Sequence, residues 1–126
     1  MPQALGYLLV FIGGGLGAVA RHGVGRAGLA LLGPGFPWWT LAVNVTGSFL
    51  IGLLAGIFGA TETGNNLRLF LTTGFLGGFT TFSAFSLDAL TLWERGAQMQ
   101  AGLYVMGSLI LSLLAAALGL LITCLV

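Results

Sequence analysis

Hydroxyl and amide side chains recur at helical spacing in otherwise apolar stretches of this sequence. Thr40, Asn44 and Ser48 lie four residues apart, so in a helix they share one face. A second row near the C-terminal end has the same spacing, and a third group of hydroxyls is interleaved with phenylalanines. The row near the C-terminal end consists of Tyr104, Ser108 and Ser112. The group with phenylalanines consists of Thr80, Thr81, Phe82, Ser83, Phe85 and Ser86.

Nearly all of these groups are hydrogen-bond donors that carry no charge. Asp88 is the only acidic residue expected within the same stretches, and it lies near the end of one of them. Neutral donors suit an anion that must bind and then leave, and the ring edges of Phe82 and Phe85 carry partial positive charge. Each group also has a structural interpretation, because hydroxyls bond back to helix carbonyls and Asn side chains link helices. The three groups together favour a hydrated anion path.

The surrounding sequence is that of a membrane protein. Of its 126 residues, 57% are hydrophobic and 6% are charged, against about 25% charged in soluble domains. A membrane-spanning helix needs about 20 mostly apolar residues, and a tight turn over 33–37 and a polar loop over 61–66 divide the apolar runs. We therefore predict one all-α integral membrane domain over residues 1–126, embedded in a lipid bilayer. Its four transmembrane helices are predicted at about 4–31, 38–60, 67–94 and 97–125.

The third predicted helix contains a stretch that weakens helices. Gly74, Gly77 and Gly78 precede the β-branched pair Thr80 and Thr81, and these residue types have low helix propensity. Irregular backbone at membrane depth must be buried in protein or line a cavity, and its freed carbonyls could hold a cation. The pattern is consistent both with a break in the helix and with a glycine-packed helix crossing.

The basic residues give little information about orientation in the membrane. Arg68 is expected on one side, and Arg95 and Arg26 on the other, with Arg21 deeper. Because the excess of Lys and Arg sets the orientation of a membrane protein, so small a difference allows insertion in both directions. Oppositely inserted copies could then form an antiparallel dimer.

Four sequence motifs resemble those of the Fluc (CrcB) family of fluoride channels. The stretch Gly77-Gly78-Phe79-Thr80-Thr81-Phe82-Ser83-Ala84-Phe85-Ser86 is similar to the third-helix signature of that family. The first, second and fourth predicted helices carry similar motifs in the same order, which are Gly14-Gly15-Leu16-Gly17-Ala18…Arg21, Thr40-Leu41-Ala42-Val43-Asn44 and Gly107-Ser108. The resemblance extends over essentially the whole chain.

The resemblance implies a dual-topology antiparallel homodimer whose two pores release toxic fluoride passively from the cytoplasm. It implies a multi-pass location in the plasma membrane, which in bacteria is the inner membrane. It also implies a structural sodium ion at the dimer centre, held by the backbone carbonyls of Gly77 and Thr80, and a vestibule or structural role for Arg21. Two positions depart from the family pattern. Ala84 stands where many members have Thr, and Asp88 stands where some have Glu. The implied fluoride-pore residues are Thr40, Asn44, Phe82, Ser83, Phe85, Ser86, Tyr104 and Ser108.

Other classes of protein agree less well with the sequence. A small multidrug-type exporter is also a short four-helix chain, but its proton coupling needs a membrane-embedded carboxylate, and Asp88 is poorly placed for that. A non-transporting helical subunit would not need three polar groups of this kind. The sequence shows no nucleophile, acid–base pair or metal-ligand cluster typical of an enzyme. A net charge of +1 without a basic cluster gives nucleic acid no binding surface.

Overall fold

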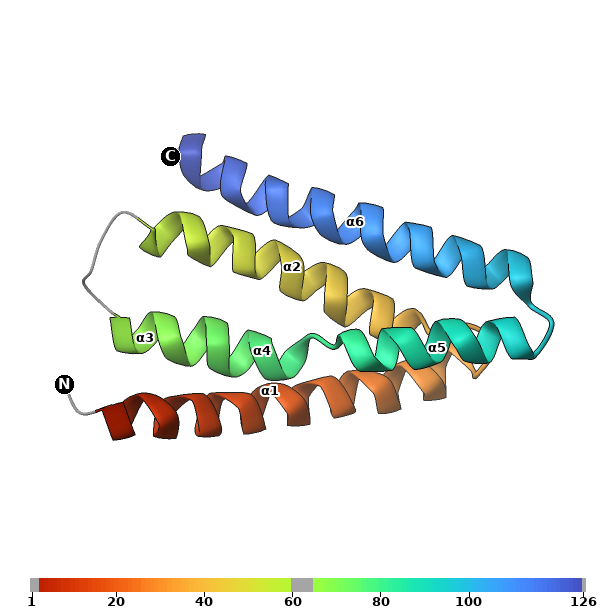
Figure 1. The fold of residues 1–126 in the computed structure, drawn as a ribbon, viewed down its shortest axis with the longest axis horizontal. Coiled ribbons are helices and arrows are strands. Elements are labelled where there is room, and N and C mark those ends of the chain that lie inside the picture. Colours follow the sequence, from red (N-terminus) through yellow and green to blue (C-terminus); the bar gives the residue numbers. More distant parts are fainter. Residues whose placement is uncertain (1–2, 60–64, 126) are drawn as a thin grey trace.

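Every regular element that the structure describes is a helix (Figure 1). The computed structural model describes residues 3–59 and 65–125. Four helical spans within these residues are long and apolar enough to cross a membrane, at Gln3–Leu32, Trp38–Phe58, Asn65–Glu94 and Gln98–Leu125. The elements are α1 (Gln3–Leu32), α2 (Trp38–Phe58), α3 (Asn65–Leu69), the π-helix η1 (Phe70–Leu76), α4 (Gly77–Phe79), α5 (Phe82–Glu94) and α6 (Gln98–Leu125).

The beginning of the third span differs from the predicted one. Asn65 and Asn66, which we predicted to belong to a polar loop, form the first turn of α3. Neither side chain is apolar, so the hydropathy pattern placed the start of the helix too late. The predicted end of the second helix at residue 60 and residues 61–64 of the predicted loop lie outside the described residues.

Glycines bring the helices together in two closely packed pairs. α1 packs against η1 and α4, and α2 packs against α6 (Figure 1). A Cβ atom added at Gly17 of α1 would lie 2.9 Å from the backbone nitrogen of Phe79. One added at Gly119 of α6 would lie 2.6 Å from the backbone nitrogen of Leu53 in α2. Only a hydrogen atom fits at these positions, as is common where membrane helices cross closely.

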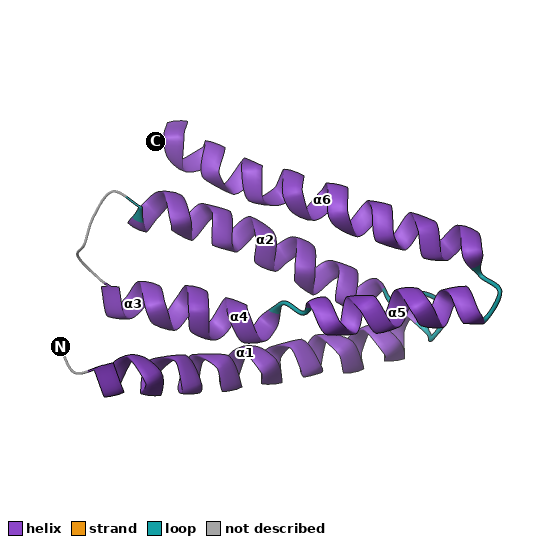
Figure 2. Cartoon of the chain, in the orientation of Figure 1, coloured by secondary structure: helices purple, strands orange, loops and turns teal. Residues whose placement is uncertain are grey.

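The third span is interrupted between α4 and α5 (Figure 2). Thr80 (φ −83°, ψ 155°) and Thr81 (φ −151°, ψ 118°) have extended backbone. The Thr81 hydroxyl accepts a hydrogen bond from the Ala84 N–H at 3.1 Å, which is the usual cap of a new helix. Two helical halves therefore meet at a short irregular segment, which we call the Thr80–Thr81 break.

The connections from α1 to α2 and from α5 to α6 lie at one end of the molecule, opposite to both chain ends (Figure 1). Gly33 and Gly96 follow α1 and α5 with φ of 76° and 85°, a left-handed conformation that glycine adopts readily after a helix. A cluster of buried residues, Leu92, Ala101 and Tyr104, joins α5 to α6.

Candidate functional site

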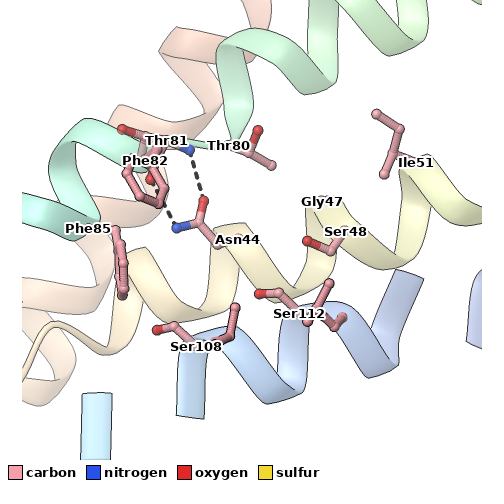
Figure 3. A pocket seen from close by; sticks show the side chains of 12 residues that line it. Asn44, Gly47, Ser48, Ile51, Thr80, Thr81, Phe82, Phe85, Ser108 and Ser112 are labelled. Atoms are coloured by element: carbon pink, nitrogen blue, oxygen red, sulfur yellow. Dashed lines mark hydrogen bonds between the residues drawn. The ribbon is translucent and has the colours of Figure 1, made fainter. Parts of the chain in front are cut away.

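A cleft of about 320 Å³ lies between α2, α6 and the interrupted third span (Figure 3). Among the described residues, its walls carry hydroxyls, one amide, two phenylalanine rings and aliphatic groups, but no charged side chain. The polar and aromatic lining residues are Asn44, Ser48, Thr80, Thr81, Phe82, Phe85, Ser108 and Ser112. Members of the polar rows on the second and fourth spans therefore share this cleft.

Asn44 holds the Thr80–Thr81 break against α2. Its Nδ2–H donates to the Thr81 carbonyl oxygen at 3.0 Å, and its Oδ1 accepts from the Thr81 N–H at 2.8 Å (Figure 3). The two bonds satisfy both polar groups of a backbone unit outside the helical ladder, which is how irregular backbone is tolerated at membrane depth. An Asn amide has two N–H donors, so one N–H of Asn44 remains for another acceptor.

Ser108 supplies a buried donor at the wall of the cleft. The residue is 5% exposed, and its Oγ has no hydrogen-bond partner among residues 3–59 and 65–125. Most buried hydroxyls in proteins are hydrogen-bonded. Ser108 therefore differs from Thr80 and Ser86, whose hydroxyls donate to carbonyl oxygens in their own span.

Phe82 and Phe85 form a tilted pair on the first turn of α5, with ring centroids 5.6 Å apart. Phe82 is 79% exposed, whereas Phe85 is half-buried. The ring of Tyr104, which does not line the cleft, packs against Phe85 with a centroid distance of 5.3 Å. Of the two rings, Phe85 is therefore the one that the rest of the chain holds firmly.

Tyr104 is buried next to the cleft and is not among the residues that line it. The side chain is 1% exposed, and its hydroxyl donates to the Asp88 carboxylate at 3.0 Å. Because this bond uses the only hydrogen that the hydroxyl can donate, the tyrosine offers the cleft a supporting ring rather than a donor.

A second cavity of about 310 Å³ lies beside α1. Thr40 and Asp88 line it together with Arg21, and Thr81 is shared with the cleft. The Arg21 Nε–H donates to the Gly78 carbonyl oxygen at 3.1 Å, which ties α1 to α4. The structure thus assigns Thr40 and Asn44, one helical turn apart, to different cavities.

Ser83 and Ser86 line neither of these two cavities in the single chain. The Ser83 and Thr81 hydroxyl oxygens lie 3.3 Å apart, and the Ser86 hydroxyl donates to the Phe82 carbonyl oxygen at 2.9 Å. The Ser86 bond matches the structural interpretation of a helix hydroxyl, in which the side chain bonds back to a carbonyl of its own helix, whereas Ser83 contacts another side chain.

The structure therefore gathers half of the predicted pore residues and adds others. The pore set implied by the family resemblance omitted Ser48, Thr81 and Ser112, all of which line the cleft. Ser48 and Ser112 complete the two rows with four-residue spacing, so the sequence contained the signal for them. The predicted pore residues that do line the cleft are Asn44, Phe82, Phe85 and Ser108.

Four apolar spans with a neutral, donor-lined cleft define a multi-pass helical membrane protein whose site suits a small ion. Residues 8–120 match the family model described as "CrcB-like protein, Camphor Resistance (CrcB)". The chain belongs to the CrcB family, which confirms the resemblance seen in its motifs.

Curated relatives carry the name fluoride-specific ion channel FluC. The protein of Sphingopyxis alaskensis is 54% identical over 114 residues, which are 90% of each chain. That of Mesorhizobium japonicum is 51% identical over 113 residues, which are 90% of this chain and 91% of the relative. That of Rhodopseudomonas palustris is 55% identical over 109 residues, which are 85% and 87% of the two chains. The family match over residues 8–120 contains the second and third apolar spans and most of the first and fourth.

Proposed function

We propose that this protein is a fluoride-selective channel that lets toxic fluoride leave the cytoplasm passively across the plasma membrane, in bacteria the inner membrane. Its family and the names of its relatives support an ion channel rather than an enzyme. The observation that carries the proposal is the Ser108 hydroxyl, buried at the wall of a neutral cleft and unpartnered among the described residues. An unsatisfied buried donor costs folding free energy, so we infer that it serves a passing anion.

Fluoride entering the cleft exchanges water for donors of the protein. These are the Ser108 hydroxyl, the second N–H of Asn44 and the ring edges of Phe82 and Phe85. Hydrogen bonds to an ionised acceptor are short and strong, whereas a fixed cation in the cleft would hold the ion too tightly to release it. A narrow path with short-range donors favours fluoride over the larger chloride ion.

The remaining predicted pore residues have supporting places in this proposal. Thr40 lies on the second cavity, which we assign to the approach of the ion, and Tyr104 supports Phe85. Ser83 is exposed beside the break, and Ser86 lies one turn further along α5. Both hydroxyls are assigned to the part of the pore that a second copy of the chain completes.

The Ser108→Ala variant is expected to conduct less and to be at least as stable as the wild type. A hydrogen bond to a charged partner contributes about 1.5–3 kcal/mol, so fluoride efflux from liposomes should fall roughly 10- to 100-fold. The folded protein meanwhile loses an unsatisfied buried hydroxyl, so its thermal midpoint should stay the same or rise.

The control is Thr123→Val, which removes a hydroxyl from the same helix. Thr123 donates to the Leu120 carbonyl oxygen at 2.7 Å and is not a lining residue of the cleft. A lower midpoint with unchanged efflux in Ser108→Ala would make Ser108 a packing residue and contradict the proposal.

The break is open to lipid in a single copy, which supports pairing of two chains. Gly77 and Ser83 flank the break and are exposed, and Phe82 is 79% exposed. Irregular backbone does not face hydrocarbon in membrane proteins, so protein must cover it. We assign this cover to a second copy inserted in the opposite direction, since the weak Arg bias of the sequence permits both orientations.

The single cysteine of the sequence provides a test of opposite insertion. Cys124 is exposed near the end of α6. In sealed vesicles a membrane-impermeant maleimide should label about half of the chains, because both orientations are populated. The other half should be labelled after permeabilisation. Labelling of all chains, or of none, before permeabilisation would contradict dual topology.

Backbone oxygens at the break support a sodium site between the two copies. In an unbroken helix the Gly77 carbonyl would accept from the Thr81 N–H, but that N–H donates to Asn44. The Thr80 carbonyl would accept from the Ala84 N–H, which instead donates to the Thr81 hydroxyl. Carbonyls of broken membrane helices are suitable sodium ligands. If the ion binds there, replacing sodium by choline lowers the thermal midpoint, and equal midpoints in both salts would argue against the site.

A further inference from the structure

Arg95 ties the connection between α1 and α2 to the turn between α5 and α6. Its Nη2 donates to the Gly35 carbonyl oxygen at 2.8 Å, and its Nη1 donates to the Pro34 carbonyl oxygen at 3.5 Å. Both connections lie at the same end of the molecule (Figure 1). A guanidinium group can bond two carbonyls at once because its donors form a rigid planar fork.

The residue that follows these carbonyls, Phe36, packs against the buried cluster of Leu92, Ala101 and Tyr104. Its ring meets the ring of Tyr104 edge to face, with a centroid distance of 5.5 Å and an interplanar angle of 90°. Tyr104 in turn packs against Phe85, which lines the cleft. A continuous series of contacts therefore runs from the Arg95 guanidinium through Phe36 and Tyr104 to the wall of the cleft.

We propose that Arg95 and Phe36 are positioning residues for the pore, and that they act by fixing the ring orientation of Phe85 through Tyr104. This inference rests on the proposed function. The orientation matters because the edge of an aromatic ring is positive and its face is negative. If Tyr104 shifts, Phe85 can turn its face toward the anion, and an attractive contact becomes a repulsive one.

The position of Phe85 makes outside support necessary. α5 begins at Phe82, directly after the Thr80–Thr81 break, so no continuous helix holds its first turn from the N-terminal side. Behind Phe85 lie the buried cluster of Leu92, Ala101 and Tyr104 and, packed against it, Phe36. The Asp88 carboxylate fixes the hydroxyl end of Tyr104, and Phe36 supports its ring.

Fluoride efflux from liposomes gives the first test. Phe36→Leu and Arg95→Gln should each lower fluoride efflux about tenfold while the protein remains assembled. The reason is that one aromatic edge contact changes the ratio between two orientations of the Phe85 ring by up to about that factor. The matched control is Trp38→Leu, since the Trp38 ring also neighbours Phe36, with a centroid distance of 4.5 Å, but is 49% exposed. Its efflux should stay within about twofold of the wild type, as expected for a surface change.

A double-mutant cycle separates positioning from general loss of packing. If Phe36 acts through Phe85, the double variant Phe36→Leu/Phe85→Leu should show an efflux rate within about twofold of that of Phe85→Leu alone. The reason is that the free-energy effects of coupled residues do not add. Losses that simply multiply would overturn the inference.

A spectroscopic measurement keeps the inference distinct from the proposed function. The sequence has two tyrosines, Tyr7 and Tyr104, so 3-fluorotyrosine in a Tyr7→Phe background reports on Tyr104 alone. Phe36→Leu and Arg95→Gln should shift or broaden its ¹⁹F resonance, and Trp38→Leu should not. An unchanged resonance in the first two variants would overturn the positioning role. Absence of fluoride efflux from the wild type would instead remove the proposed function and leave this readout intact.

Discussion

Fluoride efflux through the Asn44→Asp variant is expected to fall roughly a thousandfold. A carboxylate about 4 Å from a fluoride ion opposes it by roughly 4 kcal/mol at the effective dielectric constant of a partly solvated site, which is about three orders of magnitude in rate. The variant also loses the Nδ2–H that donates to the Thr81 carbonyl oxygen at 3.0 Å. Two negatively polarised oxygens would then face each other at the break.

The control for this variant is Asn66→Asp, which makes the same chemical change in the exposed first turn of α3. Both variants should be compared by liposome efflux, with size-exclusion chromatography to show that each remains assembled. Efflux through Asn44→Asp within a few fold of the control would mean that the passing ion does not approach Asn44.

The second large effect is expected from Gly17→Ala, which should strongly reduce the yield of folded protein. A Cβ atom at Gly17 would overlap the Phe75 carbonyl group and lie 2.9 Å from the Phe79 nitrogen. These are backbone atoms that cannot turn aside, so α1 must move away from η1 and α4. Overpacking of this kind costs about 1–3 kcal/mol and in rigid surroundings more, and it would also pull Arg21 from the Gly78 carbonyl.

Gly15→Ala adds the same methyl group two residues earlier, where an added Cβ meets no atom within 4 Å. Its yield and thermal midpoint should match those of the wild type. If Gly17→Ala gave the same midpoint as Gly15→Ala, the close packing of α1 on the third span would not be a determinant of stability.

The four spans were predictable because the hydrocarbon core sets both the length and the polarity of a helix that crosses it. The places of Asn44 and Ser108 were also predictable, since residues at four-residue spacing share a helix face. The stretch that holds the Thr80–Thr81 break was marked by its glycines and threonines, although the sequence left a plain helix crossing open.

The partners of these residues were not predictable from spacing. The Thr81 backbone bonds to Asn44, and the Tyr104 hydroxyl to Asp88, only because each pair of helices meets at a particular rotation. Close backbone contacts at glycines such as Gly17 set that rotation, and 22 glycines in the sequence offer many equally good contact patterns. For the same reason the sequence could not separate Thr40 from Asn44.

Efflux of fluoride and chloride from liposomes containing the purified wild-type protein, read with ion-selective electrodes, tests the proposed function most directly. A fluoride-selective channel should release fluoride rapidly and chloride very slowly, without an imposed proton gradient. Release of neither anion from a well-folded protein, or release of both at similar rates, would contradict the proposal.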